Sequence, residues 1–328
     1  MTWRAAVIGC GRIGSGFADD PLLAGDVYTH CEAYARCAAT ELVAVCDRDP
    51  DVAKRCGERW NVASFTAIED VLGAGPEIVS ICTPDETHYE IARRALEARS
   101  VRAILCEKPL ATELEQGEEL VRLARERGKT IAIAYVRRYA DNFCALRRLL
   151  GEGGLGPIRA VAGWYGKGVL HNGSHWFDLL RMLGGEIAWV EAADRLGEGG
   201  EDPSLDVTLG LASGAVATLR AADSRKYSLF EMDLLLGRGR ISIRDGGHRT
   251  ELYRARPSER YSGYSELVAA PHDFGDMRNL MLHAVEDLAG ALTSGRPPLC
   301  TGDDGLAALR IAMAARRSAA QNGARVEV

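Results

Sequence analysis

The chain has 328 residues, of which 47% are hydrophobic and 26% charged, and its formal net charge at pH 7 is −6. The length favours two domains and the composition is typical of a globular protein. The acidic balance argues against nucleic acid or a membrane surface as the main partner. No apolar stretch approaches the ~20 residues of a membrane span, and the N-terminal apolar run is too short for a signal peptide.

Nine cysteines are scattered along the chain, and none forms a C-x-x-C pair. Several lie inside apolar runs, and the odd number argues against a closed set of disulfide bonds. This usage is typical of reduced, buried thiols. We therefore expect a cytoplasmic protein.

Strand-like and helical patterns alternate through the first part of the chain. Five apolar runs suit strands buried on both faces of a parallel sheet, namely WRAAVIGCGRIG, ELVAVCDRDP, PEIVSICTP, VRAILCEKP and KTIAIAYVRR. Helical patterns such as ETHYEIARRALEA and ELEQGEELVRLARERG lie between them. In the second pattern, Thr112 and Glu115 have the spacing of a capping box, which predicts the start of the helix, and Gly128 predicts its end. This alternation predicts an α/β fold with a doubly wound parallel sheet, the Rossmann arrangement, over residues 1–138.

After about residue 140 the pattern changes to short β-like stretches between a few helices. The helical pattern DNFCALRRLLGEG precedes four stretches, PIRAVAGWYG, EIAWVEAADRL, LDVTLGLASGAVATLRAAD and FEMDLLLGRGRISI. Turn residues at 213–214 and 237–239 are typical of hairpins. Helices are expected around 276–293 and 302–320. We predict an α+β domain over residues 139–328 with a large, mainly antiparallel open sheet.

A glycine-rich turn follows the first strand. Gly9, Gly11 and Gly14 have G-x-G-x-x-G spacing directly after that strand, the context in which the motif binds a dinucleotide. Gly9 would allow a tight turn, Gly11 the approach of a pyrophosphate, and Gly14 close packing of helix and strand. Arg12 and Ile13 belong to the same loop and are included in the expected cofactor site. The alternative is a glycine-rich turn without a ligand.

An acidic residue at the end of the second strand should bind the adenosine ribose. Asp47 has this place but follows Gly14 by 33 residues, so we predict that residues 16–30, with Pro21 and Gly25, form a loop inserted into the first helix. The carboxylate favours NAD because it would repel a 2′-phosphate. Arg48 leaves NADP open, since its guanidinium could hold a phosphate or stack on adenine, although a solvated surface arginine is an equal alternative.

These motifs together resemble the Gfo/Idh/MocA family of NAD(P)-dependent sugar and cyclitol dehydrogenases. The resemblance covers nearly the whole chain and rests on the glycine motif and on ICTPDETH at 81–88, LCEKPLA at 105–111, YVRRY at 135–139 and GSHWFDLL at 173–180. It implies that the cofactor site also includes Thr83, Pro84, His88, Glu107 and Lys108. It further implies that Lys108 lies next to the nicotinamide, that His175 is the catalytic histidine, and that the second domain binds substrate and forms homodimers or homotetramers through its sheet.

The chemistry of alcohol oxidation supports these two roles independently. A base must take the hydroxyl proton, and histidine titrates near neutrality. A desolvated lysine can stabilise the developing alkoxide and share the proton, whereas arginine is too firmly protonated. Lysine is scarce in this arginine-rich chain, which makes Lys108 notable. The alternatives are a lysine that pairs with Glu107 or caps a turn, and a structural histidine at 175.

The stretch GVLHNGSHWFD, residues 168–178, also raises the question of a metal site. His171 and His175 are four residues apart, a spacing at which two imidazoles on one helix can share a metal. Ser174 or Asn172 could cap the helix that follows, so that the residues before the cap would not be helical and His171 need not share a face with His175. No convincing third ligand lies nearby, and we expect no metal.

His171 departs from the resemblance, because many family members have an aspartate at this position. In the family that aspartate helps to position the substrate or shares in proton transfer. Either His171 takes this role, or His171 and His175 work together in a different way. Further expected substrate contacts are Asn172, Tyr165 and Lys167, from their proximity in sequence, and Arg138 of the YVRRY motif.

The predicted reaction is hydride transfer between NAD(P) and a secondary alcohol or ketone of a sugar, amino sugar or cyclitol. The partner would be a small polyol-like substrate. Two alternatives remain open: a non-catalytic NAD-binding regulator of the same fold, and a relative that reduces an imine or the C=C of a tetrapyrrole.

Overall fold

The computed structural model describes residues 2–197, 199–225 and 227–328, and the chain divides into two compact units. Unit 1 comprises Met1–Ala140 and Arg278–Leu309, and unit 2 comprises Asp141–Met277 and Arg310–Val328. The predicted second domain, 139–328, included residues 278–309, which instead pack within unit 1. The functional division into a cofactor domain and a substrate domain stays a prediction.

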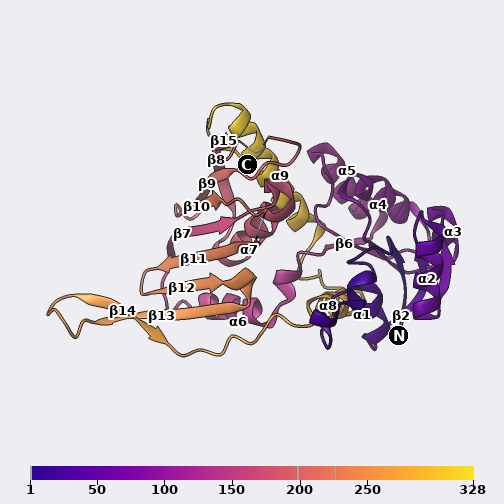
Figure 1. The fold of residues 1–328 in the computed structure, drawn as a ribbon, viewed down its shortest axis with the longest axis horizontal. Coiled ribbons are helices and arrows are strands. Elements are labelled where there is room, and N and C mark those ends of the chain that lie inside the picture. The colour runs from indigo at the N-terminus through magenta and orange to yellow at the C-terminus, as the bar shows by residue number, and fades with distance from the viewer. Residues whose placement is uncertain (1, 198, 226) are drawn as a thin grey trace. The chain divides into compact units, whose positions relative to one another are not determined.

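Unit 1 is built on a six-stranded parallel sheet with strand order β3-β2-β1-β4-β5-β6 (Figure 1). The strands are β1 (Trp3–Ile8), β2 (Thr40–Cys46), β3 (Ala63–Phe65), β4 (Ile78–Ile81), β5 (Ala103–Cys106) and β6 (Thr130–Ile133). Every residue of β4 and β5 is buried, as the continuous apolar runs predicted. The doubly wound α/β prediction is confirmed, and the strand order reverses between β1 and β4, where such sheets bind ligands.

Helices cover this sheet on both sides. They are α1 (His30–Arg36), α2 (Pro50–Trp60), α3 (Ile68–Gly73), α4 (His88–Glu97), α5 (Leu114–Arg127), α8 (Leu280–Ser294) and the first part of α9 (Gly302–Ala320), with short 3-10 turns η1 (Gly16–Asp19), η2 (Pro21–Leu23), η3 (Asp85–Thr87) and η4 (Val136–Tyr139). α1 packs against α8 and α4 against α5 (Figure 1). The α8 residues Met281, Val285 and Leu288 lie in the core of unit 1, which explains why this late segment joins it.

The ends of α5 show one correct and one wrong prediction. Gly128 ends the helix in the left-handed conformation, with φ of 63°. The capping box at Thr112 is wrong, because the helix begins at Leu114 with Glu113 at the N-cap and no side-chain cap hydrogen bond.

The first helix is interrupted where the insertion was predicted. Residues 16–23 form the two 3-10 turns, and α1 begins only at His30. The backbone N–H of His30 donates to Ile13 O at 3.1 Å and that of Cys31 to Gly14 O at 3.0 Å. The helix that starts after the glycine motif is therefore cut by the insertion, and α1 takes over its hydrogen bonding.

Unit 2 contains a nine-stranded sheet with strand order β14-β13-β12-β11-β7-β10-β9-β8-β15. The strands are β7 (Ile158–Tyr165), β8 (Ile187–Ala193), β9 (Asp206–Leu211), β10 (Val216–Ala221), β11 (Phe230–Leu236), β12 (Gly239–Arg244), β13 (Arg249–Pro257), β14 (Ser265–Ala270) and β15 (Val326–Glu327). Among the strand pairs in the described part of this unit, only β7–β10 is parallel, which confirms the mainly antiparallel open sheet. Figure 1 shows the β13–β14 hairpin at the sheet edge, reaching beyond the neighbouring strands.

One face of this sheet carries the helices of unit 2. They are α6 (Asp141–Gly151), η5 (Gly168–Gly173), which is a π-helical turn, α7 (Ser174–Gly184), the 3-10 turn η6 (Asp245–Gly247) and the end of α9. α7 lies close to the sheet because Gly163 has no side chain, and an added Cβ would meet Trp176 Nε1 at 2.6 Å. The indole Nε1 of Trp176 donates to Glu231 O at 3.0 Å. α7 is thereby held against β7 and β11.

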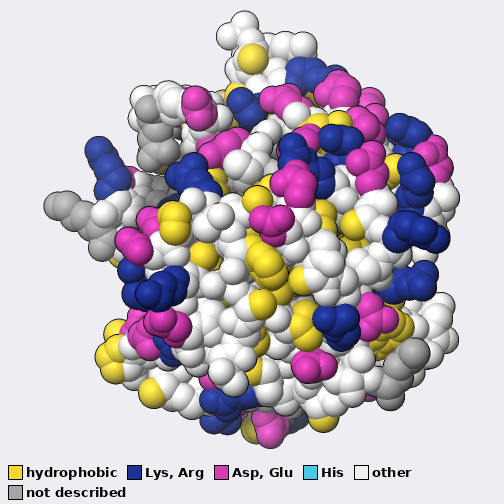
Figure 2. Space-filling view, turned by 90° about the vertical axis from the view of Figure 1, so that its right-hand side faces the viewer, with side chains coloured by type: hydrophobic (Ala, Val, Ile, Leu, Met, Phe, Trp, Pro, Cys, Tyr) yellow, Lys and Arg dark blue, Asp and Glu magenta, His cyan; other side chains and the backbone are white. Residues whose placement is uncertain are grey.

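The surface is mixed in charge. On the face drawn in Figure 2, basic and acidic side chains are interspersed, and apolar atoms are exposed mainly in its middle. Among the residues that the structure describes, no helix has the length and apolarity that a membrane crossing needs. All nine cysteines are described, and none of them forms a disulfide bond.

Candidate functional site

The three motif glycines have different surroundings at the end of β1. Gly9 has a φ of 95°, and a Cβ there would lie 2.6 Å from the carbonyl of Cys82. A Cβ on Gly14 would lie 2.0 Å from Gly9 O, whereas a Cβ on Gly11 would meet no atom within 4 Å. Gly9 and Gly14 thus permit close packing, and Gly11 leaves the backbone accessible, as a bound pyrophosphate requires.

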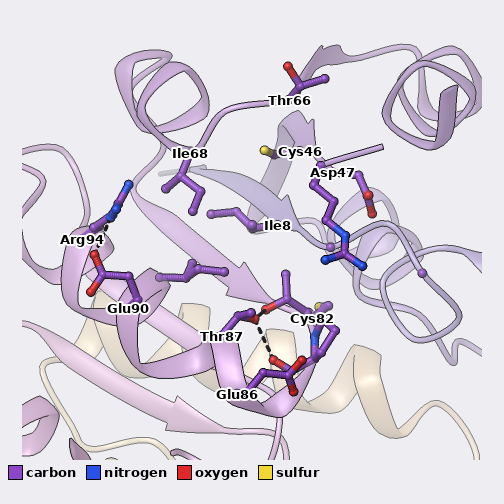
Figure 3. A pocket seen from close by; sticks show the side chains of 16 residues that line it. Ile8, Cys46, Asp47, Thr66, Ile68, Cys82, Glu86, Thr87, Glu90 and Arg94 are labelled. Atoms are coloured by element: carbon purple, nitrogen blue, oxygen red, sulfur yellow. Dashed lines mark hydrogen bonds and ion pairs between the residues drawn. The ribbon is translucent and has the colours of Figure 1, made fainter. Parts of the chain in front are cut away.

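A cavity of about 470 Å³ lies at the carboxyl ends of β1, β2 and β4 (Figure 3). Six of the predicted cofactor residues line it: Gly9, Gly11, Asp47, Arg48, Thr83 and Pro84. The lining also includes residues that were not predicted, namely Ile8, Cys46, Thr66, Ile68, Cys82, Glu86, Thr87, Glu90, Ile91 and Arg94. In Figure 3, the apolar Ile8 and Ile68 lie between Asp47 at one end and the Glu90–Arg94 pair at the other. The cavity therefore has an apolar middle with charged groups at its ends.

Two backbone N–H groups hold the Asp47 carboxylate in place. Oδ2 accepts from the N–H of Cys10 at 2.8 Å, and Oδ1 accepts from that of Asp49 at 3.0 Å. Each carboxylate oxygen has a second lone pair. Asp47 can therefore accept further hydrogen bonds from a diol within the cavity, while the exposed Arg48 follows it directly.

The other predicted glycine-loop residues lie outside the lining of the cavity. The Arg12 guanidinium is exposed and stands over the Phe17 ring, 4.4 Å from its centroid. Ile13 is half-buried against the core of unit 1. The geometry gives these two side chains a packing role.

His88 joins two loops instead of lining the cavity. Its imidazole is completely buried, with Nδ1 2.7 Å from Pro109 O and Nε2 2.9 Å from Thr83 O. Carbonyl oxygens only accept, so both ring nitrogens must donate, as in an imidazolium. Burial opposes this charge, but Cys106 and the two carbonyls raise the pKa of His88 to about 10. His88 thus holds the Thr83 loop and the segment that contains Lys108 together.

Glu107 and Lys108 follow β5 in this segment. Lys108 is 9% exposed, and the Glu107 carboxylate Oε1 lies 3.1 Å from His30 Nε2. Burial raises the pKa of Glu107, but the hydrogen bond from His30, together with the charges of Lys108 and His88, lowers it below its usual value. A carboxylate therefore stands beside Lys108, and His30, which no sequence motif indicated, supports it.

In unit 2, the segment before α7 is helical, which corrects the prediction. Residues 168–173 form η5, which continues into α7. The Ser174 hydroxyl donates to His171 O at 3.2 Å and does not cap the helix. Instead, the Asp202 carboxylate accepts from the N–H groups of Leu170 at 2.7 Å and His171 at 2.8 Å. A carboxylate distant in sequence can satisfy these N–H groups, so no local cap is needed.

His171, Asn172 and His175 consequently lie along one continuous helical segment. His171 is exposed, whereas Asn172 and His175 are half-buried. Within residues 2–197, 199–225 and 227–328, no group of three or more His, Cys, Asp or Glu side chains is arranged to hold a metal ion.

Tyr165 and Lys167 were expected to contact substrate, but the structure gives both other partners. Tyr165 is completely buried, and its hydroxyl donates to Leu205 O at 2.9 Å and accepts from Leu205 N at 2.8 Å. The ammonium of Lys167 donates to the Ser228 hydroxyl at 2.7 Å. Proximity in sequence did not indicate where these side chains point.

Arg138 is likewise a structural residue of unit 1. Its buried guanidinium donates to the Asp304 carboxylate at 3.1 Å and to Leu299 O at 3.2 Å. These contacts tie η4 to the start of α9, and they correct the expectation of a substrate contact.

Comparisons with known proteins agree with this fold. Residues 3–135 match an oxidoreductase family, GFO_IDH_MocA, described by its NAD-binding Rossmann fold. The chain is 27% identical to an inositol 2-dehydrogenase of Rhizobium meliloti (strain 1021), over 98% of each protein. It is 34% identical to a D-glucoside 3-dehydrogenase of Escherichia coli (strain K12), over 47% of this chain and 41% of that protein.

A solved structure shows the same fold over the full length. A levoglucosan dehydrogenase in complex with NADH superposes with a TM-score of 0.82 at 20% identity, covering 100% of this chain and 99% of that one. The strand order, the glycine turn and these matches agree with the motifs at residues 81–88 and 105–111. Residues 3–135 therefore match the Gfo/Idh/MocA family of oxidoreductases, as the motifs in this part of the chain predicted.

Proposed function

We propose that this protein is an NAD(P)-dependent dehydrogenase that acts on a secondary alcohol, or its ketone, of a sugar, amino sugar or cyclitol. The observation that carries the proposal is the cavity at the carboxyl ends of β1, β2 and β4, with its accessible turn at Gly11 and its anchored carboxylate at Asp47. The names of the relatives, an inositol 2-dehydrogenase and a D-glucoside 3-dehydrogenase, support the polyol class. In this proposal unit 1 binds the cofactor and unit 2 the substrate.

The residues around the cavity fit a dinucleotide. The backbone at Gly11 would face the pyrophosphate, and the Asp47 carboxylate would accept from the adenosine ribose. Thr83 and Pro84 also line the cavity and would contact the cofactor. When bound, NAD accepts a hydride from a carbinol carbon, or NADH returns it to a ketone.

Lys108 and His175 would handle the charge and the proton. His175 would take the hydroxyl proton as the hydride leaves, because an imidazole can act as a general base near neutral pH. The Lys108 ammonium would stabilise the developing alkoxide, and Glu107 beside it supplies a counter-charge. His171 and Asn172, on the same helical segment as His175, would bind neighbouring hydroxyls.

A substrate panel combined with five variants tests this proposal. Purified protein should reduce NAD or NADP with at least one sugar or cyclitol. His175→Ala should lower turnover by about 10²–10⁴-fold, the usual contribution of a general base. Lys108→Arg should also lower turnover strongly, and the double variant should be little worse than either single one, because residues that act together are not additive. Lys167→Arg is the matched control and should leave turnover unchanged, since Lys167 contacts Ser228.

Three outcomes would contradict the proposal. Full turnover in Lys108→Arg or His175→Ala would remove that residue from the reaction. A failure of every polyol, with NAD still bound, would favour the regulator or the imine reductase. A loss in His171→Ala as large as that in His175→Ala would reverse their roles.

We also propose that the open face of the nine-stranded sheet packs against a second copy of the chain. On this face the neighbouring strands β10, β7 and β11 bring Val216 and Leu235 beside Ala160, and Val216 and Leu235 are 40% and 45% exposed. Apolar side chains exposed together are typical of an interface. Light scattering should give the mass of a dimer or tetramer, and Leu235→Glu should lower it. A monomeric wild type would contradict this proposal.

A further inference from the structure

Four side chains of unit 1 form a line of hydrogen bonds that ends at Glu107. Tyr34 Oη lies 2.8 Å from Ser80 Oγ, Ser80 Oγ lies 2.8 Å from His30 Nδ1, and His30 Nε2 lies 3.1 Å from Glu107 Oε1. Tyr34, Ser80 and His30 are completely buried, whereas the Glu107 side chain is 14% exposed. The line therefore runs from the interior to the residue that precedes Lys108.

Three separate parts of the fold supply these side chains. His30 and Tyr34 are four residues apart on α1 and so share its face towards the sheet. Ser80 lies in β4, and Glu107 follows the adjacent strand β5. Because α1 resumes at His30 directly after the insertion, the insertion determines which residue of the chain meets Glu107.

The hydrogen-bond partners determine the direction of each hydrogen. Burial raises the pKa of Tyr34, so its hydroxyl stays protonated and must donate, and Ser80 Oγ is the acceptor beside it. The single Ser80 hydrogen then points to His30 Nδ1, which accepts it. His30 Nε2 consequently carries the ring hydrogen and donates it to Glu107. If His30 Nδ1 instead donated to Ser80, either the Ser80 or the Tyr34 hydrogen would have no acceptor among these groups, which is costly in a buried site.

We propose that Tyr34, Ser80 and His30 form a relay of fixed hydrogen bonds that keeps Glu107 a carboxylate beside Lys108. His30 is then a positioning residue, because it acts on the reaction through Glu107 and Lys108. Its effect on turnover rests on the proposed function, whereas the order of the hydrogens does not.

Several groups besides His30 face the Glu107 carboxylate. They are Lys108 of its own segment, the His88 imidazole of α4 and the Cys82 thiol that follows β4. The two cations remain when His30 is replaced, so they limit the expected change. Loss of the His30 hydrogen bond should raise the pKa of Glu107, because that hydrogen bond is one of the contacts that lower it.

Histidine NMR on the cofactor-free protein tests the relay without any activity measurement. In ¹⁵N-histidine-labelled protein near neutral pH, the signals that disappear in His30→Asn identify His30. We expect a neutral ring with Nε2 protonated and Nδ1 unprotonated. Tyr34→Phe should keep this tautomer because Ser80 can still donate, whereas Ser80→Ala should disturb it. A doubly protonated ring, or a hydrogen on Nδ1, would overturn the proposal.

The pH profile of ketone reduction tests the link to the reaction. In this direction His175 must be protonated, so its titration does not mask the loss of the Glu107 charge at low pH. His30→Asn removes the donor at the Nε2 position, and its acid limb should move towards neutrality by about one to two pH units. His30→Gln places an amide N–H near that position and should restore the wild-type limb.

The NMR measurement and the pH profile together distinguish a failure of the relay from a failure of its link to the reaction. If His30→Asn lowers only the melting temperature and the acid limb does not move, His30 merely packs and the proposal is wrong. If Lys108→Ala retains full turnover, the role proposed for Lys108 fails, and with it the link between His30 and the reaction, whereas the NMR tautomer still decides whether the relay exists.

Discussion

Replacing Asp47 with alanine should abolish recognition of the adenosine 2′-hydroxyl of NAD. The carboxylate at the end of β2 accepts from the N–H groups of Cys10 and Asp49, and both oxygens keep a lone pair for a ribose hydroxyl. A hydrogen bond to a charged group contributes about 1.5–3 kcal/mol. That contribution corresponds to roughly a 10- to 150-fold change in Kd.

A cofactor analogue isolates this contact from the damage that the substitution does elsewhere. Asp47→Ala also removes the two backbone hydrogen bonds, which loosens the glycine turn and weakens every dinucleotide. Wild-type protein should bind NAD roughly 10- to 150-fold more tightly than 2′-deoxy-NAD, and Asp47→Ala should bind the two with nearly equal Kd. Calorimetric titration of both ligands measures the four affinities. Arg48→Ala is the matched neighbouring control and should keep the discrimination.

The same variant should narrow the difference between NAD and NADP. Two unit charges of the same sign about 4 Å apart repel by about 4 kcal/mol at an effective dielectric constant of about 20. Removing the Asp47 charge relieves this repulsion of a 2′-phosphate. The reasoning is refuted if wild-type protein binds NAD and 2′-deoxy-NAD equally, or if it prefers NADP, in which case Arg48 would be the residue that selects the cofactor.

Two further predictions concern the glycine turn and His88. Gly11→Ala should weaken NAD binding but leave the melting temperature of the cofactor-free protein unchanged. Gly14→Ala should lower that melting temperature, because its Cβ would lie 2.0 Å from Gly9 O. Equal melting temperatures of the two variants would contradict these assignments. The pKa of His88 is raised from 6.5 to about 10, so its stabilising contribution is fully present below about pH 6.5 and is lost as the pH rises towards 10. Urea unfolding between pH 6.5 and 10 should show that the free energy of unfolding falls as the pH rises, and the fall should be smaller in His88→Gln. An equal fall in the two proteins would argue against a buried imidazolium.

The strands predicted from the sequence are those with a local apolar signal. β1, β2, β4, β5 and β6 are continuous apolar runs because both faces of the sheet are covered. β3 was missed because its three residues are half-buried or exposed, and β13 because it alternates charged and half-buried residues. β15 has only two residues. Strands of this kind are stabilised by pairing with a neighbour, which leaves little trace in their own sequence.

Candidate site residues likewise divide into those that a local sequence signal indicated and those whose contacts depend on distant parts of the chain. The residues at strand ends, such as Gly9, Asp47 and Thr83, were recognisable because the motif and the strand that positions it are adjacent in the chain. Tyr165 and Lys167 were assigned from proximity in sequence and Arg138 from the YVRRY motif, and the structure gives each of them a distant partner. A strand residue and its neighbour point to opposite faces, so adjacency says nothing about a shared target.

The sequence alone thus determined the Rossmann class of the first unit, the mainly antiparallel open sheet of the second and the family that residues 3–135 match. Hydrophobic periodicity and glycine spacing are local properties, and they persist in the linear chain. Only the tertiary structure decided that His30 supports Glu107, 77 residues away, and that Asp202 holds the helical segment at His171, 31 residues away. Such polar contacts depend on where the backbone carries two distant side chains, and no local pattern specifies that path.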